Sequence, residues 1–149
     1  IRPTDVAEDS MFGKILCAND GSERAFRAMT LAVTMAKENA AELHMVSVEE
    51  IDYMPEFIEE IREQTGTAAR RFHKAHQRAR ALADEHHVDL RFHVMAGHAV
   101  RDIVRLAGEI KVDLLVIGAT GHSQFYERML GSRADRLVHL APCPVLVVR

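Results

Sequence analysis

Glycines and a serine near the carboxyl end of the chain have the spacing of a phosphate-binding loop. Gly118 and Gly121 follow an apolar run, and Gly131 and Ser132 come after nine intervening residues. Glycine lets a ligand approach the main chain, and at positive φ its amide can turn toward an anion. A serine beside the unpaired amides of a helix start adds a hydroxyl donor for phosphate. From spacing alone, the pattern predicts either a phosphate site or a loop with turn glycines and a serine N-cap.

Five apolar runs of strand length alternate with helical patterns and must position these residues. The expected strands are Lys14–Ala18, Leu43–Val48, Leu90–Val94, Asp113–Gly118 and Val145–Val148. Apolar residues at three- and four-residue spacing predict helices over residues 22–39, 57–86, 100–107 and 132–140. In the second helical segment, Gly66 is a candidate break. Residues 90–94 alternate as an edge strand does, whereas residues 113–118 are almost wholly apolar, as in a buried central strand.

This alternation of strands and helices predicts a Rossmann-like α/β fold. We expect a five-stranded, parallel, doubly wound sheet of order 3-2-1-4-5 with helices on both faces. Ligands of such sheets lie beyond the carboxyl ends of the strands. Functional residues are therefore expected in four segments: Ala18–Ser22, Val48–Glu49, Gly97–Ala99 and Gly118–Ser132.

The composition limits the classes of protein that the chain can be. Its 149 residues fit one domain, which we expect over residues 11–149, with residues 1–10 a tail, a linker or a cloning remnant. No apolar run reaches the roughly 18 residues of a membrane span. With 19 basic and 22 acidic residues, no general attraction to nucleic acid or to an anionic membrane is expected. Two distant cysteines suggest the reducing cytoplasm.

Three separated blocks of the sequence resemble the universal stress protein family. They are the glycine pattern of 118–132, the Asn-Asp-Gly-Ser-Glu segment at 19–23, and the Ala-Pro-Cys-Pro-Val-Leu-Val-Val segment at 141–148. The resemblance covers residues 12–149. Because the ATP-binding branch of that family carries this glycine pattern intact, the resemblance implies that the chain binds ATP, with Mg²⁺.

The resemblance also implies a role for individual residues. Asp20 and Val48 would serve the adenosine, Ile117 would form an apolar wall for the base, and Gly118 would lie against the ribose. Phosphates would be held by Gly121, Gly131 and Ser132, assisted by the amides of Arg133 and Ala134. A carboxylate suits ribose hydroxyls or a metal ion, and branched apolar side chains suit an aromatic face. In the family the last strand pairs with its counterpart, which implies a homodimer through Val145–Val148 and would cover an exposed sheet edge.

Other polar residues have two interpretations. Residues 122–130 form either a lid that brings Arg128 to the phosphates or a surface loop. His73 and His76 have a spacing that suits a metal ion, but no third ligand type completes a set, which favours a solvated helix face. Surface positions are likewise expected for His86, His87, His93 and His98.

The sequence contains no recognisable catalytic motif. It has no G-x4-G-K-[ST] loop, no G-x-G-x-x-G fingerprint and no G-x-S-x-G elbow, so rapid phosphoryl transfer is not expected. Three functions remain open. The first is an ATP-binding regulatory module of the stress response, whose nucleotide alters the dimer or the contact with an unidentified protein partner. The second is a slow ATPase or adenylate-using enzyme, and the third is a nucleotide-free interaction domain.

Overall fold

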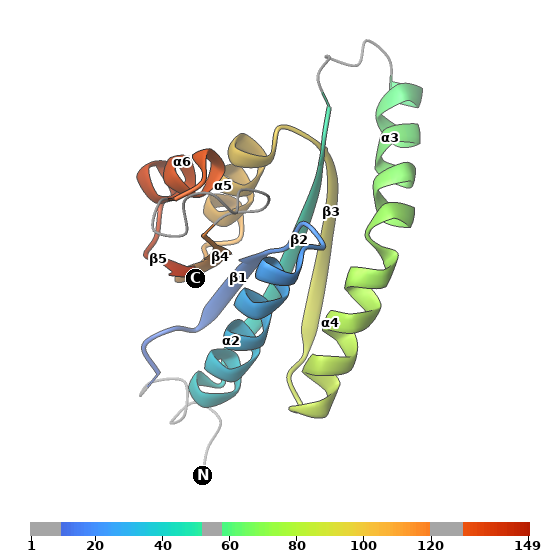
Figure 1. The fold of residues 1–149 in the computed structure, drawn as a ribbon. Coiled ribbons are helices and arrows are strands. Elements are labelled where there is room, and N and C mark those ends of the chain that lie inside the picture. The colour runs from blue at the N-terminus through green and yellow to red at the C-terminus, as the bar shows by residue number, and fades with distance from the viewer. Residues whose placement is uncertain (1–9, 52–57, 120–129) are drawn as a thin grey trace.

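The expected alternation of strands and helices is present in the computed structural model, which describes residues 10–51, 58–119 and 130–149 (Figure 1). In chain order the elements are β1 (Lys14–Ala18), α2 (Glu23–Asn39), β2 (Glu42–Glu50), α3 (Ile58–Arg71), α4 (His73–Glu85), β3 (Leu90–Gly97), α5 (Ala99–Glu109), β4 (Leu114–Gly118), α6 (Ser132–Leu140) and β5 (Val145–Val148). The strands form one parallel sheet in the order β3-β2-β1-β4-β5, so the predicted fold class and strand order are confirmed.

Two apolar layers hold the helices against the sheet. Residues of α2 and α4 pack with Ile15 and Cys17 on one face, and residues of α5 and α6 pack with Leu16 and Leu115 on the other. Successive strand residues point to opposite faces, so a strand covered on both sides must be apolar throughout. This requirement explains the continuous apolar runs in β1 and β4. Because all five strands are parallel, their carboxyl ends lie at one edge of the sheet.

Several element boundaries differ from the sequence prediction. β2 and β3 extend beyond the predicted strands and remain paired up to Glu50 and Gly97. Parallel pairing thus overrides the low strand propensity of the glutamates. The long helical segment divides at the buried Phe72, between α3 and α4, and not at Gly66. Gly66 lies inside α3, where an added Cβ would have its nearest neighbour, Arg70 Nη1, at 3.8 Å.

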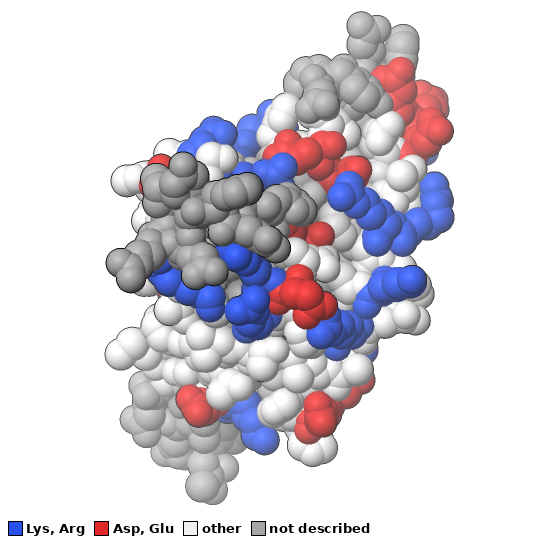
Figure 2. All heavy atoms as spheres, viewed as in Figure 1, with Lys and Arg blue, Asp and Glu red and all other residues white. Residues whose placement is uncertain are grey.

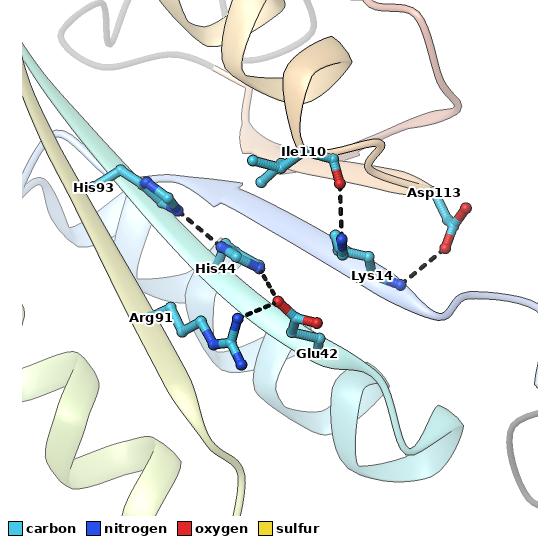
Figure 3. Close-up of polar contacts among 7 residues, drawn as sticks. All are labelled: Lys14, Glu42, His44, Arg91, His93, Ile110 and Asp113. Atoms are coloured by element: carbon cyan, nitrogen blue, oxygen red, sulfur yellow. Dashed lines mark hydrogen bonds and ion pairs between the residues drawn. The ribbon is translucent and has the colours of Figure 1, made fainter. Parts of the chain in front are cut away.

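At the amino ends of the strands, which we call the amino edge, polar groups bond to one another (Figure 3). Asp113 Oδ2 accepts hydrogen bonds from the amides of Gly13 and Lys14, both at 2.9 Å. The Lys14 ammonium donates to the carbonyl of Ile110 at 2.8 Å, at the carboxyl end of α5. A cation there also interacts favourably with the helix dipole. These contacts attach the start of β1 to β4 and to α5.

A chain of side chains crosses β2 and β3 at this edge (Figure 3). His44, 4% exposed, lies with Nε2 2.7 Å from Glu42 Oε1 and Nδ1 2.8 Å from His93 Nε2. Arg91 donates to the same carboxylate oxygen at 2.8 Å. Because a carboxylate only accepts, Nε2 of neutral His44 carries the proton, and Nδ1 accepts from His93. The prediction of a surface position for His93 is therefore wrong, since its half-buried ring stacks on His44.

His76 is the second histidine for which the expectation of a solvated position is wrong. Its half-buried ring stacks on Phe92 with centroids 4.5 Å apart. Burial lowers the pKa of His76, and the nearby His73 lowers it further. Among the described residues, no group of three histidine, cysteine or acidic side chains is placed to hold a metal ion. No helix in the described ranges is long and apolar enough to cross a membrane.

Candidate functional site

The loop after β1 is fixed by bonds to the neighbouring strand β2. The amide of Asn19 donates to the Val46 carbonyl at 2.9 Å, and the Asn19 carbonyl accepts from Ser47 Oγ at 2.6 Å. The buried Asn19 side chain accepts from the amide of Gly21 at 2.8 Å. Gly21 has φ of +88°, a conformation that favours glycine. The loop therefore turns sharply at the carboxyl edge, which is the edge formed by the carboxyl ends of the strands.

Asp20 and Ser22 end this loop at the start of α2. Asp20 Oδ1 accepts from the Ser22 amide at 2.9 Å, which orients an otherwise exposed carboxylate. Ser22 Oγ accepts from the Ala25 amide at 3.1 Å and is the N-cap of α2. The helix predicted over residues 22–39 thus has Ser22 as its N-cap. Asp20 thus presents an oriented carboxylate at the carboxyl edge.

Gly118 ends β4 at the same edge, against the first turn of α2. An added Cβ would lie 3.4 Å from the main-chain carbon and oxygen of Arg24. The sequence interpretation was that this glycine gives a ligand access to the main chain. The structure adds a packing observation, because an added Cβ would already be in van der Waals contact with the first turn of α2. The main chain of Gly118 also borders the cavity described below.

The start of α6 supplies main-chain donors. Gly131 is its N-cap and donates its amide to the Ala119 carbonyl at 2.9 Å. The first helical bond runs from the Asp135 amide to the Gly131 carbonyl, also at 2.9 Å. The amides of residues 132–134 precede that bond, at the positive end of the helix dipole. Ser132 and Arg133 are exposed there, whereas Ala134 is buried.

These elements surround a cavity of about 380 Å³, here called the carboxyl-edge cavity. Eight of the nine residues that the sequence assigned to ATP line it: Asp20, Val48, Ile117, Gly118, Gly131, Ser132, Arg133 and Ala134. The ninth, Gly121, lies outside the described residues, as do Thr120 and most of the proposed lid, including Arg128. The structure thus brings four distant segments of the chain to one hollow, and the binding role of each residue remains a prediction.

The sequence reasoning missed part of the cavity wall. Val46 from β2, Val100 and Ile103 from α5, and Leu137 from α6 extend the apolar surface that Val48 begins. The spacing of the α5 residues predicts only that they face the sheet. Val100 and Ile103 lie in the first turns of a helix that begins directly after a strand, and therefore close to the carboxyl edge. That position was the signal that could have identified them.

A second cavity of about 310 Å³ adjoins the first and shares with it Asp20, Ser22, Val48 and Arg133. Arg71, at the end of α3, lines this second cavity and forms an ion pair with Glu49. Arg133 Nη2 lies 3.6 Å from Glu50 Oε1. On the face that Figure 2 shows, basic and acidic side chains are interspersed, with no broad area of one sign.

The fold and the cavity define a doubly wound α/β domain with its candidate ligand site at the carboxyl edge. The universal stress protein family model matches residues 11–149, and the chain belongs to that family. It is 36% identical to the universal stress protein YxiE of Bacillus subtilis over 151 residues, covering 93% of this chain and 100% of the relative.

Two solved structures show the same architecture. Universal stress protein UspA from Lactobacillus plantarum superposes with a TM-score of 0.77 at 28% identity, covering 92% of this chain and 97% of that one. A universal stress protein in complex with cAMP has a TM-score of 0.75 at 23% identity, covering 94% and 99%. The membership of the family predicted from the three sequence blocks is confirmed.

Proposed function

We propose that the chain is a nucleotide-binding regulatory module of the stress response, and that it holds ATP in the carboxyl-edge cavity. The observation that supports this most strongly is the convergence of eight residues, assigned to ATP from four segments of the sequence, on one cavity. A family member solved with cAMP provides a precedent for an adenine nucleotide in this fold. Cys17 and Cys143 are free thiols, which suit a reducing compartment, and we therefore propose the cytoplasm as the location of the protein.

The chemistry of the cavity wall fits the parts of the nucleotide. Val46, Val48 and Ile117 offer an apolar surface to the base, and the Asp20 carboxylate accepts from ribose hydroxyls. The amides of residues 132–134 and the Arg133 guanidinium face the phosphates, because helix starts and arginine both favour such anions. Mg²⁺ is commonly held by one or two carboxylates together with phosphates. A single Asp20 carboxylate therefore fits an ion that arrives with the nucleotide.

The regulatory output that we propose is pairing of β5 with a second copy of the chain. All four residues of β5 are half-buried, and among the described strands β5 bonds only to β4. The Ala119 amide donates to the Val148 carbonyl at 2.9 Å, and Ala119 also lines the cavity. Ala119 thus links the cavity wall to β5, the strand that we propose pairs with a second copy. Sedimentation with and without ATP tests this, and a monomer under all conditions at micromolar concentration contradicts it.

Calorimetric titration with ATP, ADP and AMP tests the binding proposal. We compare the wild type with Gly131→Val, which places a branched side chain at the phosphate end, and with Gly66→Val in α3 as the matched control. Gly131 has φ −64° and ψ 159°, which valine also adopts, so the variant is expected to fold. We expect ATP to bind the wild type and the control equally, and Gly131→Val at least about tenfold more weakly, or 1.4 kcal/mol.

Other results of this titration lead to other functions. No heat with any of the three nucleotides would support the nucleotide-free interaction domain. Equal binding by the wild type and Gly131→Val would show that the phosphate end is assigned wrongly. Metal-dependent turnover of ATP that Asp20→Ala abolishes while binding persists would make the chain a slow ATPase.

A further inference from the structure

Glu50 connects three elements at the boundary between the two cavities. It is the last residue of β2, and its Oε1 accepts from the Ala99 amide at the start of α5 at 2.9 Å. The same oxygen lies 3.6 Å from Arg133 Nη2 in the first turn of α6, and Oε2 lies 3.9 Å from His98 Nδ1. The Glu50 side chain is 34% exposed, so solvent reaches it. The carboxylate is therefore fixed by a main-chain donor but only loosely paired with Arg133.

The pairing with Arg133 is of the kind that an incoming anion can replace. Hydrogen bonds between charged groups have N···O distances near 2.7–2.9 Å, well below the separation seen here. The Arg133 side chain is 58% exposed, and exposed ion pairs contribute little to stability. Arg133 lines both cavities, whereas Glu50 lines only the second. The guanidinium can thus move from Glu50 toward the first cavity without a change of the main chain.

We infer that Glu50 is a specificity-determining residue of the site, because it competes with the ligand's phosphates for Arg133. The inference rests on the proposed function and deepens it. A nucleotide with a long phosphate chain must draw Arg133 away from Glu50 and bear the repulsion of that carboxylate. A ligand without phosphates does neither. Glu50 therefore lowers the affinity for ATP and leaves the affinity for adenosine unchanged.

The test is calorimetric titration of the wild type, Glu50→Gln, Arg133→Gln and the double variant with Mg-ATP and with adenosine. Glutamine keeps an oxygen acceptor for the Ala99 amide and removes only the charge. Glu49→Gln is the matched control, because it removes the neighbouring carboxylate, whose partner is Arg71. Thermal unfolding of each variant shows that it is folded.

We expect Glu50→Gln to bind ATP about fivefold more tightly than the wild type, the size of an exposed charge interaction. Adenosine binding stays the same, and Glu49→Gln has a smaller effect on ATP. In the Arg133→Gln background, Glu50→Gln then changes ATP affinity much less.

Three results overturn the inference while leaving the proposed function intact. They are an unchanged or weaker ATP affinity in Glu50→Gln, an equal gain for adenosine, and a full gain that persists without Arg133. If the wild type binds neither ATP nor adenosine, both the proposed function and this inference are rejected.

Discussion

The two edges of the sheet use polar groups in opposite ways. At the amino edge, Glu42, His44, Arg91 and His93 bond directly to one another at 2.7–2.8 Å. At the carboxyl edge, polar groups surround a hollow, and the pair between Glu50 and Arg133 is loose. Polar groups that bond to one another fix a structure, whereas polar groups around a cavity have capacity for a ligand. The comparison predicts that amino-edge substitutions change stability and carboxyl-edge substitutions change binding.

The largest effect is expected from His44→Ala. It removes a buried ring and leaves His93 without its acceptor, so we expect a loss of about 3 kcal/mol in the free energy of unfolding. Affinity for ATP stays within about twofold of the wild type, since the change lies at the other edge. Urea unfolding and titration measure the two quantities. His139→Ala, at an exposed position on α6, is the control and changes stability little. Loss of ATP affinity in folded His44→Ala would remove the distinction between the edges.

A smaller effect at the amino edge depends on pH. Burial lowers the pKa of His93, and the neighbouring His44 lowers it further. The unfolded chain then binds more protons than the folded chain, so stability falls as pH drops below the unfolded histidine value of about 6.5. Glu42 affects stability at lower pH. The hydrogen bond from His44 lowers the pKa of Glu42, so the stability that this carboxylate contributes is lost as pH falls below the usual glutamate range.

His93→Asn tests this origin of the pH dependence. Asparagine keeps a donor toward His44 and does not titrate. We expect unfolding free energies between pH 7 and 5.5 to fall less steeply in this variant. The slope does not vanish, because the pKa of His76 is also lowered. One proton sets a limit of about 1.4 kcal/mol per pH unit on the difference. An unchanged slope would mean that the pH dependence arises elsewhere.

The smallest effect on stability is expected at the carboxyl edge, from Ser132→Ala. Ser132 is exposed at the start of α6, so the substitution changes the free energy of unfolding of the protein by no more than about 0.5 kcal/mol. We expect the loss of one hydrogen bond to phosphate to lower the ATP affinity measured by titration about fivefold. Thr30→Ala removes a hydroxyl from the exposed side of α2 as a control and leaves ATP affinity unchanged. A stability loss comparable to that of His44→Ala would contradict the comparison.

The sequence was sufficient for the architecture because each element carries its own periodic signal. The buried run of β4 and the edge pattern of β3 together indicate which strands are central, and the carboxyl-edge rule then gathers Asp20 and Gly131. The pair between Glu50 and Arg133 was not predictable in this way. Periodicity describes one element at a time, and it does not say which side chains of β2 and α6 meet. The same reason explains why His93 was placed on the surface.

The tie between Asn19 and β2 has a consequence for how such a pocket can diversify. The loop after β1 is positioned by the Asn19 main chain, which bonds to Val46 and Ser47, and by an internal side-chain bond to Gly21. The neighbouring Asp20 takes part in none of these three contacts. Among the described residues, its side chain bonds only to the Ser22 amide, so its exchange leaves these three contacts in place. Under the proposed function, ligand preference at position 20 can thus change while the main-chain contacts of Asn19 hold the loop in place.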